Sequence, residues 1–381
     1  MASRRNLEQR VHARLARIGG SAVAVPRHVA NPPESCHLPG IHPETTTLRI
    51  LLACAGLRLS EEMVLGLGGG IGAGMLTFRY EREGLSTLYL GARHRWDDGI
   101  GFIEEACARL GVRIQRLETG GTRAAAWLLH ELLGRGPVIA LADPAELGHH
   151  GWPAEWGGGG HHVVVYEANA RTALLGDLGP EPVRVPAEVL ARARGKIRKD
   201  RHRLVTLEAA PATIDLEPAI QAALRACADG LLTGRRNFTV DALAAWGDRR
   251  WTRTFPPGHL LGSGLRWTYY WIERAFTGGG LMRPMYARFL TEVGLGELAG
   301  RYADLGRRWT AFAEAALPAE VPALAAMRGV PAEPGGDFPL TAAESADLVA
   351  SLRVRIGDLV DAERQAARML RDAANLAGHD P

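Results

Sequence analysis

The sequence predicts an α+β protein with a mixed N-terminal domain and an all-helical C-terminal domain. Three observations lead to this prediction. The chain has 381 residues, which is long for one hydrophobic core because domains commonly contain about 100 to 200 residues. Alternating and β-branched runs concentrate between residues 85 and 177, and apolar residues at helical spacing prevail from Pro218 onward. Helices precede most of these strands, an order that fits the α+β class.

The composition limits the classes of partner. The chain is 46% hydrophobic and 23% charged, as in an ordinary globular protein, and no apolar run approaches the ~18 residues of a membrane span. With 45 basic and 42 acidic residues, the charge is too balanced to indicate a nucleic-acid partner. The four cysteines, Cys36, Cys54, Cys107 and Cys227, have no paired spacing, and no signal peptide is evident. A reduced, cytoplasmic protein without a disulfide framework is therefore predicted.

The first segment, residues 1–30, is expected to hold a short amphipathic helix over residues 7–18 and a linker. A solvated arginine-rich face explains this helix better than a membrane contact. The second domain, residues 31–210, opens with a helix over residues 45–54, which has Pro43 before it and Gly56 after it. Strands and helices are then predicted in the order strand 85–90, helix 101–110, strand 112–117, helix 123–133 and strands 137–141, 161–167 and 172–177.

The third domain, residues 211–381, has only helical patterns. Helices are predicted over residues 219–232, 239–246, 265–276, 283–293, 298–317 and 342–377. Thr341 and Glu344 have the spacing of a capping box at the start of the last helix. Its leucine-rich face could serve a homodimer as well as an intrachain core.

Two stretches resemble a known family. The run His-Pro-Glu-Thr-Thr-Thr-Leu-Arg at residues 42–49 is followed by Leu-Ser-Glu-Glu at 59–62 and Gly-Leu-Gly-Gly-Gly at 66–70. It resembles the N-terminal domain of the butirosin biosynthesis protein H family, which reads roughly His-Cys-x-Ser/Thr-Thr-Ala-Leu-Arg at this point. Residues 271–290 resemble the helical companion domain that follows in this family. The resemblance implies a papain-like domain followed by an all-helical domain.

The resemblance also implies a reaction. The family is known for an acyltransferase of antibiotic and other natural-product biosynthesis, which moves an acyl or aminoacyl group from a carrier-protein thioester to a small amine. A carrier protein or peptide is then the expected partner and phosphopantetheine the expected donor arm, with no cofactor of the enzyme itself. However, Pro43 stands where the family has its nucleophilic cysteine. Proline has neither a thiol to attack a thioester nor an N–H to stabilise an oxyanion.

A histidine and an aspartate remain at the other positions of the implied site. Gly-His-His-Val-Val-Val at residues 160–165 resembles the family's catalytic strand, so His161 is the implied base, and Asp177 stands where the orienting aspartate belongs. Strand alternation lets only one of His161 and His162 point at the start of the helix, and the motif favours His161. The simpler alternative is that both are polar residues at the rim of a sheet.

Two routes could replace the missing thiol. Cys36, seven residues before Pro43, could fold back toward the helix as a displaced nucleophile. Alternatively, the site could hold donor and amine together, with His161 as a general base and no covalent relay. A protein that has lost catalysis and binds a carrier protein, peptide or small ligand in the old cleft is the competing interpretation.

A metal-dependent enzyme is a second alternative. His149, His150, His161 and His162 lie within fourteen residues, and with Asp143 and Glu155 they would suit zinc or non-haem iron if they converged. The spacing matches no helix-borne metal motif, and four glycines intervene, so a solvated loop is the simpler interpretation and no metal is predicted.

Substrate contacts are expected at four places: the start of the first helix, the glycine turn after it, the strand that carries His161, and a glycine-rich helix break in the third domain. An arginine after that break could bind phosphopantetheine or a carboxylate, although helix packing explains it equally well. The predicted substrate-binding residues are His42, Glu44, Thr45, Gly68, Gly69, His162 and Arg283.

Overall fold

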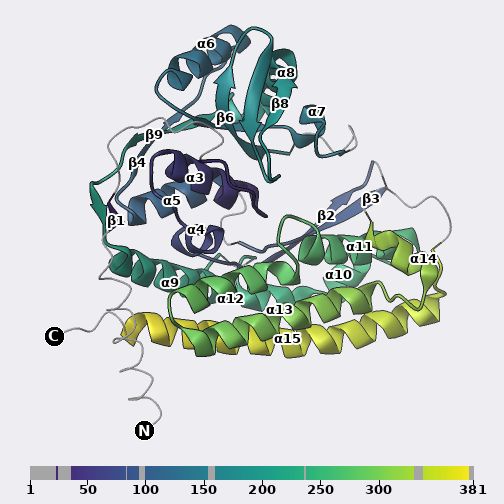
Figure 1. The fold of residues 1–381 in the computed structure, drawn as a ribbon. Coiled ribbons are helices and arrows are strands. Elements are labelled where there is room, and N and C mark those ends of the chain that lie inside the picture. The colour runs from purple at the N-terminus through teal and green to yellow at the C-terminus, as the bar shows by residue number, and fades with distance from the viewer. Residues whose placement is uncertain are drawn as a thin grey trace. The chain divides into compact units, whose positions relative to one another are not determined.

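The structure is a computed structural model that describes residues 23–24, 36–82, 84–93, 99–152, 159–235, 237–329 and 338–376. The predicted helix at residues 7–18 lies outside these ranges. The chain divides into two compact units. One, here the sheet unit, contains residues 19–68 and 99–219, and the other, here the helical unit, contains residues 1–18, 69–98 and 220–381. The α+β prediction is confirmed, because the strands concentrate in the N-terminal region and the C-terminal region is helical (Figure 1).

A six-stranded antiparallel sheet forms the centre of the sheet unit. The strand order is β4-β9-β5-β6-β7-β8. The strands are β4 (Arg113–Leu117), β5 (Val138–Ala142), β6 (His161–Ala168), β7 (Thr172–Gly176), β8 (Val183–Pro186) and β9 (Leu204–Ala209). The predicted hairpin is present, since Val164 of β6 pairs with Gly176 of β7. A separate short pair joins β1 (Val23–Ala24) to β10 (Thr213–Ile214).

Helices pack on both faces of this sheet. On one face, Val163 and Val165 belong to a buried cluster with Leu129 and Leu190, which come from α6 (Thr122–Leu133) and α8 (Ala187–Lys196). By strand alternation His162 and Val164 lie on the other face, where β6 contacts α3 (Pro43–Cys54). In Figure 1 the sheet accordingly lies between α6 and α3. The remaining helices are α4 (Glu61–Leu67), α5 (Gly99–Arg109), α7 (Pro144–Leu147) and the 3-10 turn η2 (Arg198–Asp200).

The helical unit combines one hairpin with a bundle. The hairpin strands are β2 (Met75–Tyr80) and β3 (Leu85–Leu90). The helices are α9 (Leu216–Thr233), η3 (Val240–Ala245), α10 (Arg249–Thr254), α11 (His259–Glu273), η4 (Gly280–Met282), α12 (Arg283–Glu292), α13 (Gly296–Ala316), α14 (Pro322–Ala325), η5 (Ala326–Arg328) and α15 (Ala342–Leu376). Helix α13 contacts α11, α12 and α15, and it buries Trp309 and Phe312.

The start of α15 confirms the predicted capping box. The backbone N–H of Thr341 donates to Glu344 Oε2 at 2.8 Å, and the N–H of Glu344 donates to Thr341 Oγ1 at 3.3 Å. The apolar face of α15 is buried within the unit, with Leu352 and Leu370 at 0% exposure. This face therefore contributes to an intrachain core, and a homodimer stays a prediction.

Several local predictions differ from the structure, and strands β8 and β9 and helix α8 were not predicted. Residues 240–245 form a 3-10 helix in place of the predicted α-helix over 239–246. The strand β2 was not predicted, because its outer half carries exposed side chains and its register depends on β3. The hairpin is held by contacts remote in sequence: Ser263 Oγ donates to the carbonyl of Ser86 at 2.9 Å.

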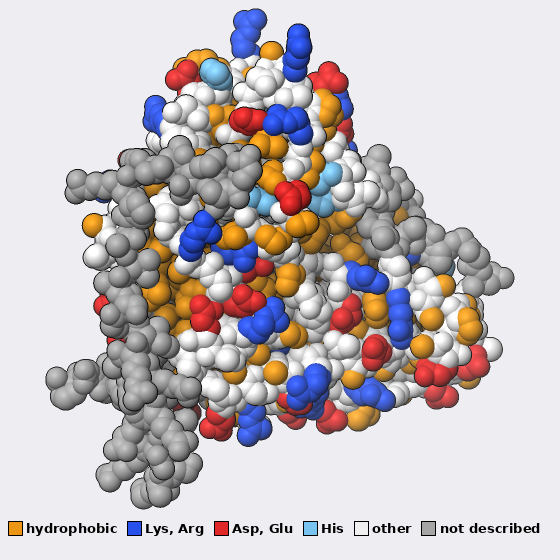
Figure 2. Space-filling view, in the orientation of Figure 1, with side chains coloured by type: hydrophobic (Ala, Val, Ile, Leu, Met, Phe, Trp, Pro, Cys, Tyr) orange, Lys and Arg blue, Asp and Glu red, His pale blue; other side chains and the backbone are white. Residues whose placement is uncertain are grey.

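Among the described helices, none combines the length and the apolar character needed to cross a lipid bilayer. Figure 2 shows basic and acidic side chains interspersed on the face in view, with no broad patch of one sign.

Candidate active site

The start of α3 is held by a carboxylate from the following helix. His42 occupies the N-cap position of α3 but makes no side-chain cap, and Pro43 follows it. Glu61, the first residue of α4, accepts instead from the backbone N–H of His42 at 2.9 Å and from the hydroxyls of Thr45 and Thr46 at 2.7 and 2.9 Å. Glu61 is 4% exposed. An acid at this end of the helix satisfies N–H groups that the helix itself leaves unpaired.

Thr45 consequently differs from its predicted role. Its side chain has no exposed surface, and its hydroxyl donates to Glu61 and to the carbonyl of His42. The structure gives Thr45 a part in fixing the helix start. A side chain with no exposed surface cannot contact a substrate directly, so the predicted substrate contact of Thr45 does not fit this structure.

Three other predicted substrate-binding residues meet at the first turn of α3. His42 Nε2 lies 3.2 Å from Glu44 Oε2, and His162 Nδ1 lies 3.9 Å from Glu44 Oε1. His162 reaches this turn because it lies on the face of β6 that contacts α3. The sequence interpretation expected the other histidine of the pair, His161, to point at the helix start. The observed contact with the first turn is made by His162.

The cysteines are not arranged as predicted. Cys36 and Cys54 form a disulfide with an S–S distance of 2.04 Å, and it joins the segment before α3 to the last residue of that helix. A disulfide sulfur is not a thiolate, so the displaced nucleophile at Cys36 is wrong in this structure. The expectation of four reduced cysteines is wrong for the same reason. Cysteine usage thus gives no argument for a reducing compartment.

The other two cysteines are poor nucleophiles. Burial raises the pKa of the Cys107 thiol to about 12, with a further contribution from the charge of Glu104. Burial also raises the pKa of Cys227 to about 11. Because the thiolate is the reactive form, none of the four cysteines in the chain offers a nucleophile.

Asp177, directly after β7, brings together three histidines. Its Oδ1 lies 2.8 Å from His161 Nε2, and its Oδ2 lies 2.8 Å from His149 Nε2 and 3.0 Å from His150 Nε2. Oδ1 also accepts the backbone N–H of Leu178 at 2.8 Å. His161 and Asp177 are 3% and 2% exposed. The structure thus brings the predicted His161–Asp177 pair together and adds two imidazoles that the sequence interpretation had assigned to a separate loop.

The electrostatics keep Asp177 ionised. Burial alone raises the pKa of this carboxyl, but the charge of His161 and hydrogen bonds from the three histidines outweigh it and hold the pKa far below the usual range. Burial lowers the pKa of His150, and the hydrogen bond to Asp177 only partly offsets this effect. An ionised carboxylate accepts the Nε2 proton of His161, so in the neutral ring Nδ1 carries the lone pair.

Local turns bring His149 and His150 to Asp177. Helix α7 is capped at its start by Asp143, whose Oδ1 accepts from the N–H groups of Ala145 and Glu146 at 2.9 and 3.2 Å. It ends at Gly148, where a φ of 80° in the left-handed region redirects the chain. Asp143 therefore caps α7, and it does not belong to the group formed by His149, His150 and Asp177.

Some of the predicted metal ligands converge. Ligand atoms of His149, His150 and Asp177 lie within 4.8 Å of one another. His161 contacts Oδ1 of Asp177, whereas His149 and His150 contact Oδ2. His162 lies instead beside Glu44. Glu155 falls outside the described residues.

The predicted glycine turn has two different explanations. At Gly68, the residue after α4, a Cβ would lie 2.0 Å from the ring of Phe102, so close packing explains the glycine. Gly69 has a φ of 101°, which a residue with a side chain rarely adopts. Neither observation involves a ligand.

Arg283 is not an anion site. It is fully buried, its Nε donates to Glu363 Oε1 at 2.7 Å, and its Nη1 donates to the carbonyl of Leu281 at 2.8 Å. The same Glu363 oxygen accepts from Trp309 Nε1 at 2.7 Å. The predicted substrate role is wrong here, because the guanidinium is used inside the bundle.

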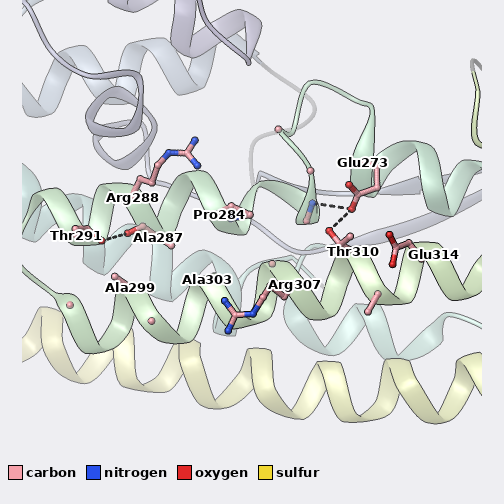
Figure 3. A pocket seen from close by; sticks show the side chains of 17 residues that line it. Glu273, Pro284, Ala287, Arg288, Thr291, Ala299, Ala303, Arg307, Thr310 and Glu314 are labelled. Carbon is pink, nitrogen blue, oxygen red and sulfur yellow. Dashed lines mark hydrogen bonds between the residues drawn. The ribbon is translucent and has the colours of Figure 1, made fainter.

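A groove of about 740 Å³ does lie beside the glycine run, lined by residues of α12 and α13. Figure 3 shows Glu273 and Glu314 toward one end of it and Arg288 toward the other. Glu273 Oε1 accepts from the N–H of Gly280 at 3.1 Å and from Thr310 Oγ1 at 2.7 Å. This acid stabilises the glycine turn.

The secondary structure makes this an α+β protein. The cluster of Asp177 and its three histidines in the sheet unit is a candidate acid–base site. Residues 42–178 match the family model described as "Butirosin biosynthesis protein H, N-terminal", and residues 188–326 match one described as "Domain of unknown function (DUF4872)". Together these matches give the two-domain architecture of the butirosin biosynthesis protein H family, and the chain belongs to that family. The family relates the chain to antibiotic biosynthesis. No curated protein matches the chain.

Proposed function

We propose that this protein is an enzyme of natural-product biosynthesis that forms an amide by moving an acyl or aminoacyl group from a thioester to an amine, without a covalent cysteine intermediate. The observation that carries the proposal is the buried His161–Asp177 pair at 2.8 Å, in a chain whose cysteines are either paired or held as neutral thiols. A carrier protein with a phosphopantetheine arm is the proposed donor. A cytoplasmic setting is part of the proposal.

The chemistry is one acyl substitution. The amine nitrogen attacks the carbonyl carbon of the thioester, and His161 Nδ1 takes the proton that the nitrogen loses as the C–N bond forms. The C–S bond then breaks, and the thiolate leaves with the proton from the imidazolium. Asp177 keeps the ring in the required tautomer and stabilises its charged form. Most of the rate would come from holding donor and amine together, and general-base catalysis typically adds about 10²–10⁴-fold.

An assay with small substrates tests the proposal. The purified full-length protein is mixed with short acyl thioesters of N-acetylcysteamine, which mimic the phosphopantetheine end, and with a panel of primary amines. We expect the amide to form faster than in protein-free buffer, as measured by mass spectrometry. Saturable thioester binding without amide formation, seen as a raised melting temperature, would contradict the enzyme and favour a binding protein.

A metal-dependent enzyme is the second candidate, favoured by the convergence of His149, His150 and Asp177. Two imidazoles and a carboxylate are a ligand set that suits Zn²⁺ or Fe²⁺. A bound ion would supply a Lewis acid that polarises a carbonyl.

Metal analysis separates the two candidates. Protein purified without a histidine tag is analysed for transition metals, alongside a variant with His149→Ala and His150→Ala. The second candidate predicts about one ion per chain in the wild type and its loss in the variant. The first candidate predicts metal well below one equivalent in both, with amide formation that survives a chelator.

A further inference from the structure

A second cavity opens at the far end of the β6–β7 hairpin. It has a volume of about 400 Å³ and is lined by α6, the β6–β7 turn, α8 and His202. Because a strand rises about 3.3 Å per residue, Ala168 at the end of β6 lies roughly 20 Å from His161 at its start. This cavity, here the Arg194 pocket, is therefore separate from the histidine–aspartate cluster. Most of its wall is apolar: Ala125, Leu129, Ala173, Ala187, Leu190 and Ala191.

One charged side chain lies buried in this apolar wall. Arg194 is 4% exposed. Its Nη2 donates to the carbonyl of His202 at 3.1 Å, and its Nη1 lies 3.5 Å from the carbonyl of Ala125. Its Nε has no hydrogen-bond partner. Within the described part of the chain, Arg194 forms no ion pair with a carboxylate.

An unpaired buried cation requires an explanation. Burial lowers the pKa of Arg194 to about 10, so the guanidinium is still charged at neutral pH. Burial, and next the charge of Arg194, lower the pKa of His202, which favours the neutral form of that neighbour. A buried charge with only carbonyl partners is costly, and an orphaned buried N–H calls for an explanation, such as an ordered water, an ion or a ligand.

The chemistry of the wall specifies the ligand. A guanidinium offers a planar fork of donors that matches the two oxygens of a carboxylate. Pockets of about 300–1,000 Å³ with apolar walls and few polar groups are typical of small-molecule sites. We infer that the Arg194 pocket binds a small organic carboxylate, whose charged end pairs with Arg194 and whose apolar body packs against the alanines and leucines.

Calorimetric titration of the full chain with hexanoate and benzoate tests this inference, with hexanamide as the neutral isostere and inorganic phosphate as an anion without an apolar body. We expect at least one carboxylate to bind saturably. Hexanamide and phosphate should each bind at least about 10-fold more weakly than that carboxylate, because hexanamide lacks the charge that pairs with Arg194 and phosphate lacks the apolar body. Equal affinity for hexanoate and hexanamide, or no saturable binding of either carboxylate, would overturn the inference.

Variants locate the site. Arg194→Gln should abolish carboxylate binding, whereas Arg192→Gln on the same helix should leave it unchanged, since Arg192 pairs with Glu146 at 2.8 Å. Ala191→Phe fills the pocket without removing a hydrogen bond of Arg194, and it should also abolish binding if Arg194→Gln proves unstable. His161→Ala should bind as the wild type does, which separates this site from the proposed transfer reaction. Undiminished binding in a folded Arg194→Gln or Ala191→Phe protein would place the carboxylate elsewhere.

Discussion

Replacing His161 with alanine should lower the rate of amide formation by about 10²–10⁴-fold, the usual contribution of a general base. The melting temperature should fall, because the buried Asp177 carboxylate loses one of its three imidazole partners, but the protein should stay folded at the assay temperature, because His149 and His150 remain as partners. The measurement is kcat with saturating thioester and amine, together with thermal unfolding of the same preparation.

His162→Ala is the matched control. His162 is the neighbouring imidazole, is equally buried and lies beside Glu44 at the start of α3. We expect the kcat of this variant to stay close to that of the wild type, with the change confined to the KM of a substrate. Undiminished turnover in a folded His161→Ala protein, with the large loss in His162→Ala, would move the base to the Glu44 side of the strand.

Replacing Glu363 with alanine should destabilise the helical unit by about 3–5 kcal/mol, the range for breaking a buried ion pair by removing one partner. Arg283 and Glu363 are both completely buried and lie 2.7 Å apart. Without the carboxylate, the guanidinium and Trp309 Nε1 lose their shared acceptor. Urea unfolding followed by circular dichroism measures the change.

The adjacent Arg364 provides the control. It pairs with Asp241 at 2.7 Å, and the carboxylate of that pair is largely exposed. Arg364→Ala should therefore change the free energy of unfolding by less than about 1 kcal/mol. Similar small losses in Glu363→Ala and Arg364→Ala would show that Arg283 finds water or another partner, against the burial described above.

Local patterns predicted most of the sheet and its hairpin. The pairing of β6 with β7, and strand β3 in the separate hairpin of the helical unit, follow from alternation and β-branching, which act over a few residues. The same register explains why His161 and Asp177, sixteen residues apart, meet at one end of the hairpin. Strand alternation also correctly placed His161 and His162 on opposite faces of β6. However, His161 was expected at the start of α3, and the structure places His162 there.

Contacts between distant residues could not be predicted. The Cys36–Cys54 disulfide requires the segment before α3 to fold back along the helix, and Glu61 of the next helix helps to hold that segment. Arg283 finds its partner eighty residues later. Arg194 lies in a charged-looking helix, and only the packing of α6 and α8 around it shows that it is buried.

His149 and His150 gave a partial signal. Their density in the sequence indicated a metal or a loop, but their common partner depends on the left-handed turn at Gly148 and on where β7 ends. The glycine was visible in the sequence, whereas its φ was not.

Intact-protein mass spectrometry during turnover tests most directly whether acyl transfer proceeds without a covalent intermediate. The wild-type protein is mixed with an acyl thioester, quenched in acid before and after the amine is added, and weighed without reduction. The amide should accumulate while the protein keeps its unmodified mass, with the Cys36–Cys54 disulfide intact. An added mass equal to the acyl group, formed with the donor and lost when the amine is added, would contradict the proposed mechanism.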